Sequence, residues 1–364
     1  MKTYKFKLKP NKTQEKTFEK WVDTTRYLYN LALEERIIAY QSVKKSISKF
    51  DQYNQLPDIK QHFPWVADVY SDTLQEVLDR VDKSFKNFFR GNGFPKWAKK
   101  GFYSSFTFKR NFTIKEKTIK LPKIGEVKYF NSRSIKGNPK IATIKKEADG
   151  WYICVVVEYT PEPKTTNDNQ VVGVDLGIVQ FATLSNGEVM ANPKFLSKSL
   201  PKLKVLQRKL SRQVKGSNER TKTKKKLAKL HKKISNQRKD FLHKVSTDLV
   251  TKYSTIVIED LNVSKMNSSV SSRLNRSISD VGFYNFRLFL QYKSKERCQE
   301  LIIVNPAYTS QTCSSCGNID KKSRKTQSKF KCVSCGFEIN ADLNASINIL
   351  SRGTTQVTQS KPLG

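Results

Sequence analysis

Hydrophobic and polar positions alternate with a period of two at the start of the chain. Tyr4, Phe6 and Leu8 fall on one side of an extended segment, and lysines fall on the other. This alternation predicts a strand over the first nine residues. The same period returns in short runs between residues 104 and 160, which are separated by turn sequences. The runs predict a small, wedge-like antiparallel β-barrel that includes the first strand, so we assign residues 1–10 and 96–165 to it.

Between these strands, apolar residues recur every three or four positions in two stretches. The first begins near Thr13, which we expect to cap a helix. The second extends from Val66 to Phe89 and is followed by Gly91, a residue type that often ends helices. Residues 11–95 are therefore expected to form a helical lobe inserted into the barrel.

Strands and helices alternate in the second half of the chain, after a polar, proline-containing linker near residues 161–169. Apolar runs within residues 171–190 predict a three-stranded meander, and Thr255–Glu259 and Leu301–Val304 predict two further strands. A last helix is expected before a flexible tail over residues 353–364. The mixture favours a multidomain protein of the α+β or α/β class.

Residues 200–245 carry a dense positive charge. Positions 202–244 contain 17 Lys and Arg against two acids, with leucines at helical spacing and a break at Gly216-Ser217-Asn218. This pattern predicts a helical hairpin with a narrow apolar seam. A solvated charged face is the plainer interpretation, but so many like charges favour a nucleic-acid contact. The residues that we expect to contact phosphates are Lys224, Lys225, Lys226, Lys232, Lys233 and Arg238.

The composition of the whole chain also indicates a nucleic-acid partner. Its 364 residues include 68 Lys and Arg against 32 Asp and Glu, a formal net charge of +36. A charge of this size predicts a large polyanionic partner rather than a small acidic substrate. The longest apolar run, Trp151–Val157, is far shorter than the roughly 20 residues of a membrane-spanning helix. We expect a protein of the prokaryotic cytosol, associated with the nucleoid; a surface for anionic lipids is the less favoured alternative.

Four of the six cysteines form two matched pairs. Two residues separate Cys313 from Cys316, and two separate Cys332 from Cys335, so each pair has the spacing C-x2-C. A glycine follows each pair. This spacing predicts a single structural Zn²⁺ held by four thiolates, with no open position for catalysis. Four unpaired thiols or a redox dithiol would leave the two matched pairs unexplained.

Three acids stand at the ends of predicted elements. Asp175 and Glu259 each end an apolar strand, and Asp342 opens the last helix. Each acid taken alone is more plausibly a cap, but together with the basic surface they suggest a site for two Mg²⁺ ions that hydrolyses phosphodiesters. Asp260 could take the role of Glu259, because only the strand register decides which side chain faces the metal. Gly173–Gly177 also resembles the phosphate loop of actin-like ATPases, but lacks the Ser or Thr that normally follows.

Several ordered segments resemble the TnpB (OrfB) family of transposon-encoded nucleases, which are related to compact type V CRISPR effectors. The resemblance covers nearly the whole chain, and the two cysteine pairs lie between the second and third acids, as in that family. One departure is Ala341, where many members carry Arg. The matching segments are Val172–Gly177, Ile258–Leu261, Gln291–Lys293, Tyr308–Gly317 and Asn340–Ser346, together with Leu8–Asn11 and Phe85–Phe89.

The resemblance implies an RNA-guided DNA endonuclease. It implies a helical recognition lobe within the barrel, and a RuvC-type, RNase H-like nuclease domain over residues 166–306 and 339–352 that contains a zinc finger at 307–338. It also implies Asp175, Glu259 and Asp342 as Mg²⁺ ligands. The expected partners are a guide RNA transcribed from the transposon end, bound by one protein monomer, and double-stranded target DNA beside a short motif. The alternatives are an RNase H-like DNA transposase and a non-cleaving, nucleic-acid-binding regulator.

Overall fold

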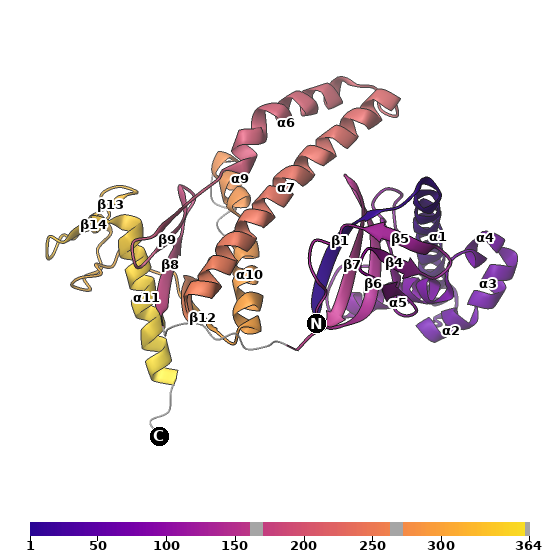
Figure 1. Cartoon of the computed structure of the whole chain (residues 1–364), viewed down its shortest axis with the longest axis horizontal. Coiled ribbons are helices and arrows are strands. Elements are labelled where there is room, and N and C mark those ends of the chain that lie inside the picture. Colours follow the sequence, from indigo (N-terminus) through magenta and orange to yellow (C-terminus); the bar gives the residue numbers. More distant parts are fainter. Residues whose placement is uncertain (161–169, 263–271, 361–364) are drawn as a thin grey trace. The chain divides into compact units, whose positions relative to one another are not determined.

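The chain folds into two compact units, Met1–Thr160 and Pro161–Gly364 (Figure 1). The computed structural model describes residues 1–160, 170–262 and 272–360. The expected linker at 161–169 lies outside the described residues. Each unit has its own hydrophobic core.

A seven-stranded sheet forms the frame of the first unit, in the order β2-β6-β7-β1-β5-β4-β3. Strand β1 lies at its centre, where Lys2–Lys7 pair with β7 and Leu8 and Lys9 pair with β5, all antiparallel. The first strand of the chain therefore links two halves of the sheet. The strands are β1 (Lys2–Lys9), β2 (Ser105–Phe108), β3 (Thr113–Ile114), β4 (Thr118–Leu121), β5 (Gly125–Tyr129), β6 (Asn138–Glu147) and β7 (Gly150–Glu158).

The expectation of a barrel needs correction. Strands β2 and β3 lie at opposite ends of the strand order, and no pairing within residues 1–160 joins them. The edge strand β3 has only two residues, Thr113–Ile114, which are already paired with β4. An edge this short offers too few free backbone groups to close the sheet. The mixed α/β architecture is confirmed, with an open sheet in place of a closed barrel.

Five helices follow β1, and two of them, α1 and α5, pack on this sheet. Helix α1 begins after Asn11, whose side chain accepts from the backbone of Gln14 while the Gln14 side chain accepts from Asn11. This capping box, not Thr13, starts the helix. Phe18 and Trp21 of α1 are buried against Phe106 of β2, with ring centroids 5.7 and 5.4 Å apart. The helices are α1 (Lys12–Val43), α2 (Lys49–Asn54), α3 (Leu56–His62), α4 (Pro64–Ala67) and α5 (Ser71–Phe89).

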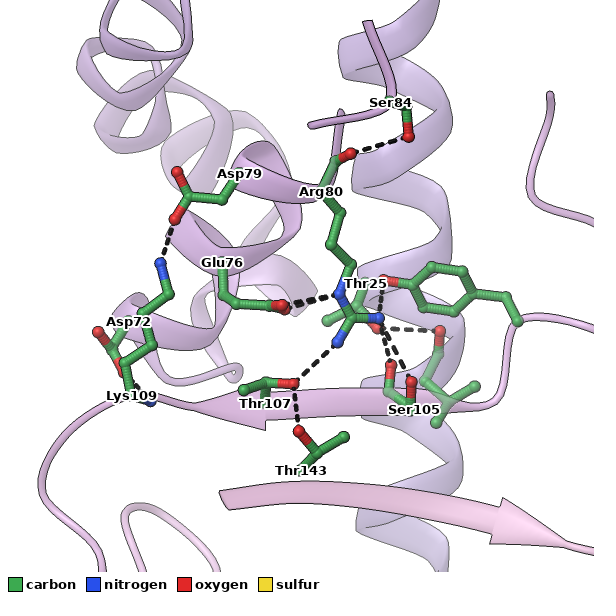
Figure 2. A network of polar contacts seen from close by, with 12 residues as sticks. Thr25, Asp72, Glu76, Asp79, Arg80, Ser84, Ser105, Thr107, Lys109 and Thr143 are labelled. Carbon is green, nitrogen blue, oxygen red and sulfur yellow. Dashed lines mark hydrogen bonds and ion pairs between the residues drawn. The ribbon is translucent and has the colours of Figure 1, made fainter. Parts of the chain in front are cut away.

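A polar network fastens α5 to β2 (Figure 2). The guanidinium of Arg80 donates to Glu76 one turn earlier at 2.9 Å, to the Ser105 carbonyl at 3.1 Å and to Thr107 Oγ1 at 2.9 Å. Asp72 accepts from the backbone N–H of Lys109 at 2.8 Å. Because buried donors are costly when unpaired, these bonds help to hold the helix on the sheet.

The second unit is built on a five-stranded sheet in the order β10-β9-β8-β11-β12. Strands β8, β11 and β12 run parallel, and β9 and β10 complete an antiparallel meander with β8. Val174 and Ile258 face a core with helices α7 and α10, whereas Val257 packs on α11. The sheet thus lies between two helical layers. Its strands are β8 (Val171–Leu176), β9 (Gln180–Leu184), β10 (Val189–Ala191), β11 (Thr255–Glu259) and β12 (Glu300–Val304).

Helices α6 and α7 form the expected hairpin, which projects from the sheet of its own unit (Figure 1). Helix α11 continues to Ser360, beyond the start of the tail that we expected from 353. None of the described helices is long and apolar enough to cross a membrane. The remaining elements are α6 (Phe195–Arg212), α7 (Asn218–Lys252), α9 (Ser272–Val281), α10 (Phe283–Glu296), a 3-10 turn (Lys321–Ser323), β13 (Lys329–Lys331), β14 (Glu338–Asn340) and α11 (Ala341–Ser360).

Candidate nuclease and zinc sites

The four paired cysteines converge on one point. Their Sγ atoms all lie within 4.8 Å of one another, and two of the separations are 3.8 Å (Cys313 to Cys335) and 3.6 Å (Cys316 to Cys332). A tetrahedral Zn²⁺ with Zn–S bonds of about 2.3 Å would place its sulfurs about 3.8 Å apart. The cluster therefore fits zinc without rearrangement.

The backbone favours the thiolate of one cysteine, Cys332, whereas hydrogen bonding with the neighbouring thiols, Cys335 first, raises the pKa of Cys316. Amide N–H groups of Cys335 and Ser334 point at Cys332 Sγ, at 3.5 and 3.4 Å, and they lower the pKa of that thiol to about 6. Gly317 and Gly336, which follow the two pairs, both have φ of 75°. This left-handed conformation suits glycine and turns each knuckle back toward its sulfurs.

Strand register brings Asp175 and Glu259 together. Strands β8 and β11 are parallel neighbours, with Val257 paired to Gly173 and Ile258 to Val174. The same register, continued by one residue, sets Glu259 beside Asp175. Side chains two apart in a strand share a face, so both acids lie on the face that carries Gly173 and Val257.

Helix α11 covers that face and supplies the third acid. A Cβ added to Gly173 would overlap the Ser346 carbonyl oxygen and lie 2.8 Å from Leu350 Cβ. Gly353 approaches the Val257 methyl groups in the same way. Asp342 lies one turn before Ser346 on the same helix, near the ends of the strands where the two acids stand.

The three carboxylates interact electrostatically. Burial, together with the charges of Glu259 and Asp342, raises the pKa of Asp175 to about 7. Burial also raises the pKa values of Glu259 and Asp342. A cluster of acids that disfavours its own ionisation is a site that a cation stabilises. Carboxylate oxygens are also the ligands that Mg²⁺ prefers, so the donor set fits the metal.

The acids are nevertheless less tightly grouped than the cysteines. Within the described residues, the cysteine cluster is the only set of three or more Asp, Glu, His or Cys side chains whose ligand atoms all lie within 4.8 Å of one another. The Arg324 guanidinium pairs with Asp342 at 3.3 Å and lowers the pKa values of all three acids, against the effect of burial. A cationic side chain thus already offsets part of the negative charge.

Two residues of this site, Arg324 and Thr309, were not predicted from the sequence. Arg324 lies among several lysines between the cysteine pairs, and nothing in the neighbouring sequence indicates that it reaches the acids. Thr309, at 3% exposure, donates its hydroxyl hydrogen bond to Glu259. Its position in the Tyr308–Gly317 segment was noted only for the family resemblance.

Buried asparagines connect the acid site to the zinc segment. On α11, Asn348 Nδ2 donates to the carbonyls of Thr309 (2.9 Å) and Thr312 (2.7 Å). One turn earlier, Asn344 Nδ2 donates to Thr312 O, and its Oδ1 accepts from the backbone N–H of Ser314. The helix that carries Asp342 therefore holds the chain that enters the first cysteine pair.

The alternative ligand Asp260 lies apart from the acid cluster. Its side chain is 60% exposed and pairs with Arg287 of α10. Neighbouring strand positions point to opposite faces, and the pKa of Asp175 responds to Glu259 rather than to Asp260. The geometry therefore favours Glu259 over Asp260 as the partner of Asp175.

The basic hairpin presents most of its expected phosphate contacts to solvent. Lys224, Lys225, Lys226 and Lys233 are exposed, and Lys232 is half-buried. Arg238 differs from these lysines, because its guanidinium pairs with Asp280 at 2.6 Å and only 23% of its side chain is exposed; its phosphate contact stays a prediction. The Asp280 carboxylate neutralises it, so its observed role is to join α7 to α9.

Comparison with known proteins identifies the chain. Family models match at residues 1–45 (described as a helix-turn-helix domain), 154–270 (probable transposase, OrfB of IS605) and 283–349 (Cas12f1-like TNB domain). A protein of Escherichia coli, "Putative RNA-guided DNA endonuclease InsQ", is 36% identical over 97% of this chain and 92% of its own length. The chain belongs to the TnpB (OrfB) family.

Two further relatives extend the comparison. A protein of Streptomyces pristinaespiralis with the same description is 31% identical over 97% of this chain and 89% of its own length. The CRISPR-associated endodeoxyribonuclease Cas12f1 of Sulfoacidibacillus thermotolerans is 30% identical over 55% of this chain and 49% of its own. Like the first relative, the Streptomyces protein is similar to this TnpB-family chain nearly from end to end.

Proposed function

We propose that this TnpB-family protein is an RNA-guided DNA endonuclease encoded by a transposon. The observation that carries the proposal is that Asp175 and Glu259, at the ends of the parallel strands β8 and β11, lie beneath the helix that carries Asp342, whose charge acts on Asp175. The named activities of the relatives and the net charge of +36 support it. In this proposal, RNA pairing selects the target and the protein reads backbone shape and a short adjacent motif.

Asp175, Glu259 and Asp342 would hold two Mg²⁺ ions, which supply an activated water and stabilise the leaving oxygen in phosphodiester hydrolysis. Thr309 orients the Glu259 carboxylate through its hydrogen bond. Arg324 stands beside Asp342 and can turn its guanidinium to a non-bridging phosphate oxygen. The four cysteines hold one structural Zn²⁺ that keeps the Arg324 loop folded.

The exposed lysines of the hairpin, Lys224, Lys225, Lys226 and Lys233, together with Lys232, would bind phosphates of the RNA or its DNA hybrid. This assignment is supported by their charge density and by the exposure of most of them. One protein monomer for each guide RNA is the expected stoichiometry.

The test is cleavage of a plasmid that carries a sequence matched to the RNA that co-purifies with the protein. We expect Mg²⁺-dependent cutting by the wild type and none by Asp175→Ala, with RNA binding unchanged. Joining of a DNA 3′ end to a target without RNA would instead support a transposase. RNA and DNA binding with no cutting under any divalent ion would support a non-cleaving regulator.

A further inference from the structure

An exposed aromatic surface lies in the first unit, at the end of α5 and in the chain that follows. We call residues 85–103 the aromatic segment. Four of its rings are strongly exposed: Phe89 (78%), Phe94 (50%), Trp97 (48%) and Phe102 (84%). Exposed rings are normal when scattered singly, but so many within one short segment indicate a binding surface.

The segment is held in place by its other residues. Pro95 is buried, and Ala98 exchanges two hydrogen bonds with the Asn30 side chain of α1, at 2.8 and 3.2 Å. Residues 99–102 form a turn in which Gly101 has φ of 83°, and the side chain of Phe102 is exposed at the end of this turn. Pro95 and Ala98 thus hold the backbone in place, while the side chains of Phe94 and Trp97 are exposed.

The rings at the end of α5 also support one another. Phe88 lies 5.4 Å from Phe89 and 5.2 Å from Phe94, and Phe85 lies 6.0 Å from Phe94, between ring centroids. Preformed ring contacts reduce the entropy that a ligand must overcome when it stacks on them. The aromatic segment is therefore an ordered surface before any partner binds.

Positive charge accompanies the rings. No acid occurs between Lys83 and Lys115, and Arg90, Lys96, Lys99 and Lys100 are all exposed. None of these four cations forms an ion pair within the described residues. Arg90 directly follows Phe89, and Lys96 directly precedes Trp97. Rings for bases and neighbouring cations for phosphates are the two parts of a site for single-stranded nucleic acid.

We infer that the aromatic segment binds unpaired bases of the guide RNA, which stack on Phe89, Trp97 and Phe102 while the adjacent cations contact phosphates. This inference rests on the proposed function, which makes RNA the resident partner. A resident partner would keep the rings covered, whereas target DNA arrives only transiently. Duplex DNA does not fit, because its bases are already stacked and expose only their edges.

The first test compares Phe89→Leu/Trp97→Leu/Phe102→Leu with Phe50→Leu in the full-length, RNA-free protein. Phe50 is also exposed (62%) and also follows a lysine, but it lies on α2 near acids, so it is a matched control. The probe is a fluorescent oligouridine of about 20 nucleotides. We expect the triple variant to bind it at least about tenfold more weakly. Duplex DNA binding should change by less than about twofold. Equal oligouridine affinities in both variants would overturn the inference.

A second measurement does not depend on the fold of the triple variant. Trp21 and Trp151 are 1% and 3% exposed and Trp65 is half-buried, so Trp97, at 48%, is the most accessible of the four tryptophans. Oligouridine should quench part of the tryptophan fluorescence of the wild type, and Trp97→Phe should lose that part while it retains affinity. The same quenching in both proteins would contradict stacking on Trp97.

Ultraviolet crosslinking of the complex with its co-purified RNA identifies the occupant. Adducts on peptides from the aromatic segment before DNA is added would support RNA; adducts that form there only with added target DNA would overturn it. DNA cutting that requires Asp175, with normal RNA binding by the triple variant, would refute this inference alone. Loss of RNA binding in the triple variant, with no cutting by the wild type, would refute only the proposed nuclease function.

Discussion

The second unit contains two clusters of potential metal ligands that differ in how completely they are assembled. The four cysteine sulfurs already stand at the spacing of a tetrahedral zinc site. Asp175 and Glu259 share a face of the sheet, Asp342 lies on the helix that covers it, and the three carboxylates repel one another and are partly neutralised by Arg324. Four thiolates close a coordination shell, whereas three carboxylates leave positions open for water and phosphate. The difference separates a site that builds structure from one suited to chemistry.

The largest expected effect comes from breaking the closed cluster. We expect Cys332→Ser to lose zinc and the order of residues 309–340, because structural Zn²⁺ contributes roughly 10 kcal/mol to folding at neutral pH. Metal analysis and limited proteolysis measure the loss. Cys298→Ser, which changes an exposed thiol outside the cluster, is the matched control. Full protease resistance of a zinc-free Cys332→Ser protein would show that metal does not hold this segment.

Breaking the open cluster should abolish activity without unfolding the unit. Asp175→Ala is expected to slow matched-plasmid cleavage by about a thousandfold or more, since it removes a carboxylate from the reaction centre. Asp260→Ala should retain most activity, because Asp260 is exposed and pairs with Arg287. Cutting that survives Glu259→Ala but is lost in Asp260→Ala would exchange the roles assigned to Glu259 and Asp260.

The third effect concerns the close approach of α11 to the sheet. Gly173→Ala should destabilise the second unit by about 3 kcal/mol, because its methyl group would meet backbone atoms of the helix that carries Asp342. Thermal melting and cleavage should both fall. Gly187→Ala is the comparison, since Gly187 has φ of 90° but nothing within 4 Å of an added Cβ, and about 1 kcal/mol is expected from backbone strain alone.

The pH dependence of stability should sharpen the contrast between the clusters. The pKa of Asp175 in the metal-free folded protein is raised to about 7 from its ordinary value of 3.8. The folded state therefore keeps a proton that the unfolded state releases, and stability should fall as pH rises from about 4 to 7. Asp175→Asn should remove most of this loss, on the order of 4 kcal/mol at pH 8, in chemical denaturation without Mg²⁺. Asp260→Asn should leave the pH profile as in the wild type.

The smallest effect is expected at the basic hairpin. Lys224→Gln/Lys225→Gln/Lys226→Gln should lower the slope of log affinity against log salt by up to about 2 for single-stranded RNA, since each phosphate contact contributes about 0.7. Arg238→Gln should leave the slope unchanged, because Asp280 already pairs with that guanidinium. An equal change of slope in both variants would return Arg238 to the RNA-binding set.

The sequence singles out the acids and cysteines as candidates because their signals are local, and the structure brings the four cysteines together as predicted. C-x2-C spacing and carboxylates at the ends of apolar strands need no tertiary information. Arg324 could not be found this way, because only the folded zinc segment carries it to Asp342. The open edge of the first sheet also depends on long-range pairing. The Asn11–Gln14 capping box, in contrast, is a local pattern, and the helix start at Asn11 could have been predicted from it.

The central place of β1 has a consequence for synthesis of the protein. Strand β1 leaves the ribosome before the other strands of its unit, and it pairs along most of its length with β7, whose last residue is Glu158. Its main neighbour is therefore not available until almost the entire unit has been translated. Such distant pairing favours slow folding, and the nascent β1 must stay unpaired or sheltered by a chaperone in the meantime.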